Sequence, residues 1–329
     1  MIVNIKKIIL IGILLMIVSI QNLFTQQYEI SFNESEELGN VHWYRNYDEA
    51  IVRAKKEKKD IVILFQEVPG CSTCRNYGHN VLSHPLMIEI LENNFIPLAI
   101  FNNKGSEDKA ILKKFNEPTW NNPVVRIIDI NGNNLVPRIN NDYSALTLSQ
   151  RLKKALALRK QPIPEFLNLL ELELASKQPN KISESYYRMS CFWTGEKQLG
   201  KLNGVLDTEA GFIGHNEVVK VKYNSDIVSN AAIDNYAKEQ NFRAIDFKKN
   251  YTIAKKDIHY FLKHSKYKYL PLTSLQQIKI NSALGSNQSA EKYLSPKQLE
   301  WLNSKEIEKQ HTLLYGMEFK AAWDILTNK

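Results

Sequence analysis

Residues 68–74 read V-P-G-C-S-T-C, and the first half of the chain is interpreted around this stretch. It follows the apolar run 61–65, which is typical of a buried strand, and precedes residues 75–89, which predict a helix. The dipole and the unpaired N–H groups at the start of a helix stabilise negative charge. Cys71 is therefore the predicted attacking thiolate. Cys74, one turn later, is placed to attack the mixed disulfide that forms at Cys71.

Two other interpretations of the C-x-x-C pair stay open here: a structural disulfide and half of a zinc site. The sequence has no second C-x-x-C, and the third cysteine, Cys191, is far along the chain. Zinc is therefore disfavoured. The seven histidines show no ligand spacing either, so the sequence predicts no metal, and no motif indicates a cofactor.

Strand and helix patterns alternate around the C-x-x-C pair. This order resembles the thioredoxin fold across residues 42–160. In that family a cis-proline opens the third core strand and faces the redox cysteines, so the resemblance implies a cis Asn122–Pro123 bond that lies against Cys71. The expected helices are 47–59, 108–115 and 146–159, and the expected strands are 61–65, 95–101, 122–129 and, after a turn at 131–132, 135–139.

The motif itself departs from the usual thioredoxin pattern, because the tryptophan and the second proline are absent. It resembles the group of thioredoxin-like proteins in which V-P-G precedes selenocysteine or cysteine. Cys71 matches the selenocysteine position of that group, which implies that Cys71 is the attacking residue.

The second half of the chain begins after segment 161–180, which the prolines and the leucine spacing predict to be a helical linker. Strands are expected at 185–189 and 218–223. From the local pattern alone, Cys191 is equally compatible with a half-buried core cysteine. However, residues 184–229 contain M-S-C-F-W, G-K-L-N-G-V, A-G-F and G-H-N-E-V-V in that order. They resemble the A-type peptide methionine sulfoxide reductases.

This resemblance implies roles for five residues. Cys191 matches the nucleophile that attacks the sulfoxide sulfur, and Glu217 matches the acid that protonates the sulfoxide oxygen, which leaves poorly unless protonated. Phe192 and Trp193 match the walls of the methyl pocket. Phe212 stands where that family has a tyrosine that helps to bind the oxygen. The alternative for Glu217 is a solvated acid at a strand edge. No cysteine follows Cys191, so the family's C-terminal resolving cysteine is absent.

The first 27 residues predict a secretory signal. Lys6 and Lys7 precede the apolar run 8–20, which is shorter than the about 20 residues that a spanning helix needs. The protein is therefore expected to be exported, periplasmic or otherwise extracytoplasmic, and attached to a membrane only if this segment stays uncleaved. The formal charge of +8 comes from lysines mixed with acids, as in 55–60, so no nucleic-acid partner is expected.

The predicted architecture is an α/β thioredoxin-like domain followed, over residues 181–329, by an α+β domain resembling A-type methionine sulfoxide reductase, with a helical C-terminal region. In that region helices are expected at 231–241, 255–265, 274–284 and from Pro296, with Ser295 as the N-cap. Trp301, Tyr315 and Trp323 are expected to be packing aromatics.

The predicted function is an exported thiol-disulfide oxidoreductase that reduces methionine sulfoxide through Cys191, with Cys71 and Cys74 as reductant. A short flexible linker would give the two sites an effective concentration around the millimolar range. The expected partners are oxidised protein or peptide substrates and an external thiol donor. Two alternatives stay open. The second domain could be an inactive recognition module for methionine-rich or oxidised proteins, or the chain could be a disulfide reductase for other exported proteins.

Overall fold

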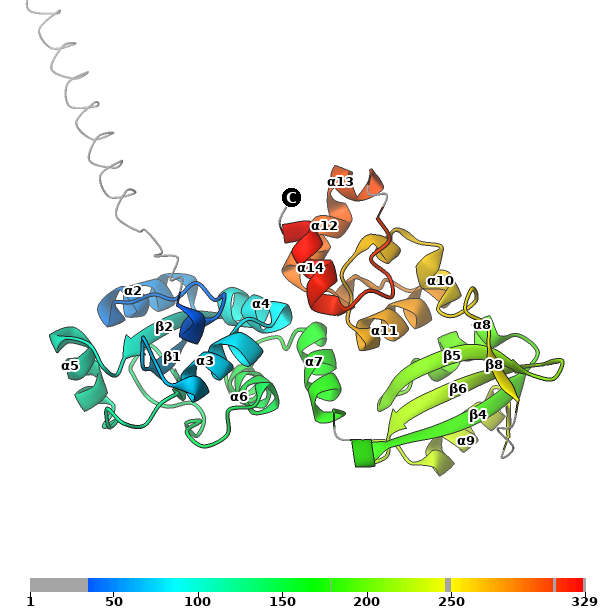
Figure 1. Ribbon diagram of the computed structural model, residues 1–329, viewed down its shortest axis with the longest axis horizontal. Helices are drawn as coiled ribbons and strands as arrows, with labels where there is room; N and C mark the ends of the chain where they lie inside the picture. Colours follow the sequence, from blue (N-terminus) through cyan, green and yellow to red (C-terminus); the bar gives the residue numbers. More distant parts are fainter. Residues whose placement is uncertain (1–34, 178, 246–249, 310–311, 328–329) are drawn as a thin grey trace, which may run out of the picture.

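The computed structural model describes residues 35–177, 179–245, 250–309 and 312–327, and the predicted signal segment 1–27 lies outside them. Two sheets lie in different parts of the molecule, with helices between them (Figure 1). Among the described residues, no helix is both long enough and apolar enough to cross a membrane.

The first sheet has three strands in the order β2-β1-β3. Its central strand β1 (Asp60–Gln66) pairs in parallel with β2 (Phe95–Phe101) and antiparallel with β3 (Val124–Ile128). Every residue of β1 is buried, which agrees with the apolar run of the sequence, because a strand covered on both faces needs no polar alternation.

The strand expected at 135–139 does not form a continuous ladder. It meets β3 at isolated bridges, one of which joins Val125 to Ile139. Pro137 lies within this segment, and a proline has no backbone N–H to donate to a ladder. The two segments of the predicted hairpin therefore lie side by side, but the second segment does not form a regular strand.

Helices cover both faces of the first sheet, and the side chains of β1 alternate between two hydrophobic clusters. Val62 and Leu64 belong to one cluster, whereas Ile63 and Phe65 belong to the other. The helical segments of this half are η1 (Glu36–Leu38), α2 (Tyr47–Glu57), α3 (Ser72–Tyr77), η2 (Gly78–Leu82), α4 (Pro85–Asn94), α5 (Ser106–Lys114) and α6 (Ala145–Leu158).

The helix expected at 75–89 is divided into three segments. Helix α3 ends at Tyr77, the π-helical turn η2 follows, and α4 begins at Pro85. His84 has an extended backbone because a following proline disfavours the helical conformation. Pro85 itself takes the first helical position, where a missing N–H is tolerated.

Helix α7 (Glu165–Ala175) lies where the linker was expected, and it is packed on two sides. Leu167 and Leu170 are buried in a cluster of the first sheet. Leu169 and Leu172 are buried in a separate cluster.

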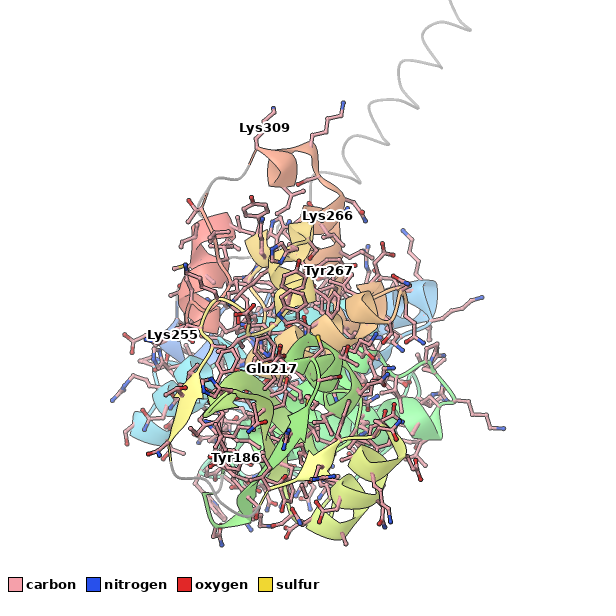
Figure 2. The ribbon with its side chains drawn as sticks, turned by 90° about the vertical axis from the view of Figure 1, so that its right-hand side faces the viewer. Tyr186, Glu217, Lys255, Lys266, Tyr267 and Lys309 are labelled. Carbon is pink, nitrogen blue, oxygen red and sulfur yellow. The ribbon has the colours of Figure 1, made fainter. Side chains whose placement is uncertain are left out.

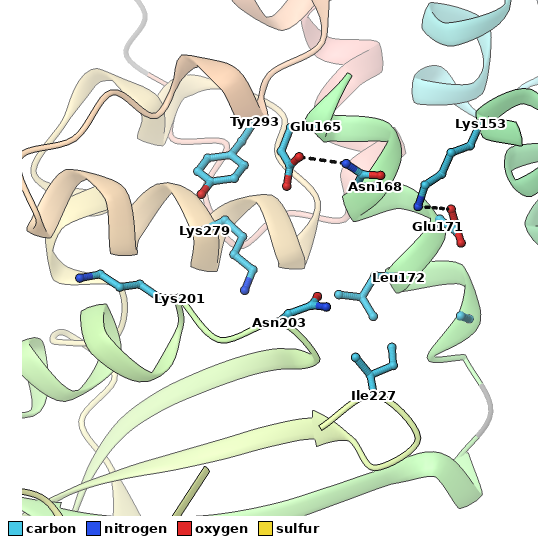
Figure 3. Close-up of a pocket in the computed structure, with 11 residues that line it drawn as sticks. Lys153, Glu165, Asn168, Glu171, Leu172, Lys201, Asn203, Ile227, Lys279 and Tyr293 are labelled. Atoms are coloured by element: carbon cyan, nitrogen blue, oxygen red, sulfur yellow. Dashed lines mark hydrogen bonds and ion pairs between the residues drawn. The ribbon is translucent and has the colours of Figure 1, made fainter. Parts of the chain in front are cut away.

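The second of these clusters joins α7 to α11 (Ser274–Gly285) through Leu275 and Ile278. On the other side, Lys153 of α6 forms an ion pair with Glu171 at 2.9 Å (Figure 3). The predicted linker therefore does contain a helix, and this helix is packed rather than free to move. Leucines on both faces of α7 fix it between the two halves of the chain.

The second sheet has five antiparallel strands in the order β7-β4-β6-β5-β8. Two short strands at its edges were not predicted, because two or three residues give no periodic pattern. The elements are η3 (Pro179–Lys181), β4 (Ile182–Met189), α8 (Phe192–Leu199), β5 (Val205–Ile213), β6 (Asn216–Asn224), α9 (Asn230–Glu239), β7 (Arg243–Ala244) and β8 (Tyr251–Ile253).

The C-terminal region is helical, and Ser295 caps α12 through a capping box, with Pro296 at the first helical position, as the sequence predicts. The helix expected at 255–265 is a single turn, because His259 before it has a left-handed backbone, with φ of 51°. The remaining elements are α10 (Tyr260–Lys263), η4 (Lys266–Tyr269), η5 (Glu291–Tyr293), α12 (Pro296–Asn303), α13 (Lys305–Glu308) and α14 (Phe319–Thr327).

Helix α14 returns to the first half of the chain. Trp323 is buried in a cluster of the first sheet and contacts Trp301 edge to face, with ring centroids 4.8 Å apart. Phe319 stacks on His84 at 5.7 Å. The aromatics of this region therefore pack the helical part against the first domain.

Candidate active site

The structure brings Cys71 and Cys74 together after β1. Cys71 is the N-cap of α3 and is exposed, whereas Cys74 is fully buried. The two sulfurs are 3.6 Å apart, and both cysteines are free thiols. This distance leaves the thiols within hydrogen-bond reach of each other and close enough to join as a disulfide after a small movement.

The surroundings make the two thiols unequal. Hydrogen bonds from the backbone N–H of Cys74, and secondarily of Thr73, lower the pKa of Cys71. Burial raises the pKa of Cys74 to about 12, and the neighbouring Cys71 sulfur adds to this increase. At neutral pH the exposed sulfur is therefore the better source of thiolate.

The turn before Cys71 is held by residues that are distant in sequence. The carboxylate of Glu37 accepts a hydrogen bond from the backbone N–H of Gly70 at 2.7 Å. Asn103 accepts from the N–H of Val68 and donates to the carbonyl of Pro69. Sequence reasoning missed both Glu37 and Asn103, because nothing in their local pattern marks them.

Gly70 is required by close approach. A Cβ at this position would lie 2.4 Å from the carbonyl oxygen of Glu67 and 2.8 Å from the Cβ of Cys74. The glycine of V-P-G therefore allows the turn to fold directly over the buried cysteine.

The Asn122–Pro123 bond is cis, as expected from the resemblance, and the Val68–Pro69 bond is cis as well. Asn122 reaches the redox pair, since its Oδ1 accepts a hydrogen bond from the Cys74 thiol at 2.7 Å. The loop at the cis-proline thus contacts the redox pair through Asn122 and the buried Cys74. The sequence predicted that this loop lies against Cys71.

Glu67 lies close to the two cysteines, which the sequence did not predict. Ligand atoms of Glu67, Cys71 and Cys74 all lie within 4.8 Å of one another. The sequence predicted no metal, and its local pattern did not connect Glu67 with the cysteines. The fold creates the group by turning the chain at Gly70.

The residues expected to form the second site lie at the start of α8 and on the adjoining strands β5 and β6. Cys191 is the N-cap of α8 and is partly buried. The backbone N–H of Phe192 donates to Glu217 at 2.7 Å, and the rings of Phe192 and Phe212 meet edge to face at 5.4 Å. Glu217 is therefore bound to the start of α8 and is not a freely solvated acid. Figure 2 shows Glu217, which lies on β6 of the second sheet, below the label of Tyr267 in the helical region.

Trp193 is covered by a segment that sequence reasoning did not connect with this site. Its ring stacks on Tyr260 at 3.8 Å, and its indole N–H donates to Asp257 at 3.1 Å. The adjacent His259 donates its backbone N–H to Glu196 of α8 at 2.8 Å. One face of the expected methyl pocket is thus occupied by the protein itself.

A cavity of about 470 Å³ lies between α6, α7, α11 and the turn after α8 (Figure 3). It contains no cysteine. Lys279 from α11 is buried there and donates to the backbone carbonyls of Gly200 and Leu202, both at 2.8 Å. This lysine fixes the end of α8 against α11.

Comparison with known proteins gives a family match for the part of the chain that carries the first site. A family described as thioredoxin-like matches residues 42–129. A solved structure described as a DsbH oxidoreductase is 18% identical, covers 40% of this chain and 94% of its own, and has a TM-score of 0.32. No curated protein matches the chain.

The class of the first half follows from these observations. Residues 42–129 form a thioredoxin-like α/β domain that carries a close pair of cysteines, Cys71 and Cys74. The described residues after 129 form a further α/β region with the second sheet and a set of helices.

Proposed function

We propose that the protein is a thiol-disulfide oxidoreductase whose reactive centre is the Cys71–Cys74 pair. The observation that carries this proposal is the asymmetry of the pair: an exposed thiol with a lowered pKa lies 3.6 Å from a buried thiol with a raised pKa. Such a pair separates the attacking role from the resolving role.

In the proposed reaction the Cys71 thiolate attacks a substrate disulfide. One sulfur–sulfur bond forms at Cys71 and the substrate bond breaks, which releases one substrate thiolate. Cys74 then loses its proton and attacks the Cys71 sulfur, releasing the second substrate thiol and leaving a Cys71–Cys74 disulfide. An external thiol donor supplies the two electrons that restore the dithiol.

The test is turnover of a disulfide-linked peptide by the full chain with a chemical thiol as donor. Cys71→Ser is expected to abolish enzyme-dependent turnover, while Cys191→Ser retains it. Equal turnover by wild type and Cys71→Ser would exclude this pair as the reactive centre.

A second candidate function is supported by the arrangement around Cys191. Phe192, which follows Cys191, donates its backbone N–H to Glu217, and its ring contacts Phe212. The resemblance to A-type methionine sulfoxide reductases assigns these residues to one site. In this reaction Cys191 attacks the sulfoxide sulfur, Glu217 supplies the proton to the oxygen, methionine is released, and Cys191 becomes a sulfenic acid. A further thiol then condenses with the sulfenic acid and releases water.

This candidate is tested by methionine formation from free and peptide methionine sulfoxide, with dithiothreitol as donor. Loss of activity in both Cys191→Ser and Glu217→Gln supports it. If the wild type forms no methionine but binds the sulfoxide peptide, the result would instead support an inactive second domain that recognises oxidised proteins. We also propose export through residues 1–27, for which N-terminal sequencing of the mature protein is the measurement.

A further inference from the structure

The geometry points to a zinc site formed by Glu67, Cys71 and Cys74. Zinc would occupy this site in the reduced protein, where the disulfide is absent. The three ligand atoms lie within 4.8 Å of one another. This inference concerns a second use of the cysteine pair, and it does not require the oxidoreductase activity to exist.

The separation of the two sulfurs suits one tetrahedral ion. With zinc–sulfur bonds of about 2.3 Å, two sulfurs on a tetrahedral zinc lie about 3.8 Å apart. The Cys71 and Cys74 sulfurs are 3.6 Å apart before any metal binds. Two thiolates can thus bind one zinc ion with little change in the backbone.

The carboxylate of Glu67 is available as the third ligand. Its side chain is partly buried, and among residues of the described ranges it has no hydrogen-bond or ion-pair partner. Its oxygens keep contact with solvent and have no competing protein partner, so they are free to turn toward an ion. A cation between Glu67 and the two sulfurs would take the place of that solvent.

The donor set selects the metal. Two thiolates and one carboxylate oxygen are typical zinc donors, whereas Cu(I) prefers sulfur alone and Mg²⁺ or Ca²⁺ prefers oxygen alone. Cys71 is exposed, so the fourth position faces solvent and is open to water or to a ligand from another molecule. Binding releases the thiol protons to solvent, and no oxidant or reductant is needed.

The expected consequence is a redox-silent form. Both sulfurs donate to the ion, so neither is free to attack a disulfide, and alkylation of Cys71 slows. Zinc therefore protects the reduced pair, and a chelator releases it.

The experiment is a zinc competition titration with a chromophoric indicator on the reduced full chain, in a Cys191→Ser background that removes the third thiol. One equivalent of Zn²⁺ is expected to bind. Glu67→Gln should weaken binding about tenfold or more, whereas Glu107→Gln, an exposed acid on α5, should leave it unchanged. Circular dichroism of both variants checks the fold.

Two results would overturn the site. Unchanged zinc affinity in Glu67→Gln would mean that the dithiol alone binds the ion. Slower release of the mixed disulfide by metal-free Glu67→Gln, with no change in zinc affinity, would instead assign Glu67 as the acceptor of the Cys74 proton. Peptide turnover measured in chelator is a separate readout, so failure of the zinc site and failure of the oxidoreductase proposal are distinguishable.

Discussion

At the scale of single residues, the two thiols of one short motif differ because their environments differ. Cys71 precedes the first turn of α3 and receives backbone N–H groups, which favour its charged form. Cys74 lies one turn inside, where burial disfavours the charged form. The proposed division of roles is thus a consequence of the position of each sulfur relative to the helix start.

The first prediction concerns alkylation of the pair. Because the pKa of Cys71 is lowered, its alkylation rate should reach its midpoint at a lower pH than that of an unperturbed cysteine in a model peptide. Cys74, with a pKa of about 12, should remain unlabelled throughout the neutral range. The measurement is peptide mapping after brief iodoacetamide treatment at a series of pH values. Equal labelling of both thiols would contradict the assignment.

The second prediction concerns Asn122, which accepts a hydrogen bond from the Cys74 thiol. Asn122→Ala removes that acceptor and destabilises the reduced form by about 1 kcal/mol. The disulfide form is then favoured, and the reduction potential falls by about 20 mV. Equilibration with glutathione measures this shift. Asn121→Ala is the matched control, and an equal shift in both variants would rule out a specific role for the hydrogen bond.

At the scale of elements, the sequence predicted the first domain well where the signal was local. Strands β1 and β2 are short continuous apolar runs, and V-P-G-C-S-T-C marks the turn into α3. The residues that hold this turn, Glu37 and Asn103, could not be predicted because they reach it from distant segments. The group of Glu67 with the two cysteines was missed for a related reason, since the close turn at Gly70 creates it.

In the second half, the pattern predicted strands β4 and β6 but not β5. The coverage of Trp193 by Tyr260 was also missed, because it depends on a long-range contact. A local pattern contains no information about which distant segment will lie on an aromatic face. The predicted helix at 255–265 was too long. Its sequence is compatible with a helix, but the left-handed backbone of His259 confines the helix to the residues that follow it.

The third prediction concerns the buried carboxylate of Glu117, which joins the turn before β3 to the segment after it. It forms ion pairs with Arg126 at 2.6 Å and Arg138 at 2.5 Å, and its side chain has no exposed surface. Glu117→Ala leaves both guanidinium groups without this partner and should lower the free energy of unfolding by about 3 kcal/mol. Urea unfolding followed by circular dichroism measures the change. The exposed Glu107→Ala is the control, and a similar small effect in both variants would contradict the prediction.

At the scale of the whole molecule, α7 and the C-terminal helices separate the two cysteine sites. Helix α3 lies on one side of α7 and helix α8 on the other (Figure 1). Because α7 is buried against both neighbours, the packed chain does not behave as two domains on a flexible linker. Transfer from Cys71 to Cys191 of the same chain would require α7 to leave its packing.

The fourth prediction follows from this arrangement. If an oxidised Cys191 is reduced by Cys71, the exchange should occur between two chains. A Cys74→Ser variant treated with oxidant should then form a Cys71–Cys191 disulfide whose yield rises with protein concentration. Non-reducing electrophoresis and peptide mapping measure it. A cross-link within the monomer, independent of concentration, would show that α7 leaves its packing and that Cys71 reduces Cys191 of the same chain.

The most direct test of the central claim, that Cys71 attacks and Cys74 resolves, is capture of the mixed disulfide. The Cys74→Ser protein is reduced and mixed with a peptide whose two chains are joined by a disulfide. One of the two chains should remain bound to the protein, and mass spectrometry should place it on Cys71. In a Cys191→Ser background, Cys71→Ser should retain none, because the one thiol left, Cys74, is buried with a raised pKa. Peptide bound to Cys74 in Cys71→Ser at the same rate, or no adduct on Cys71 in Cys74→Ser, would contradict the claim.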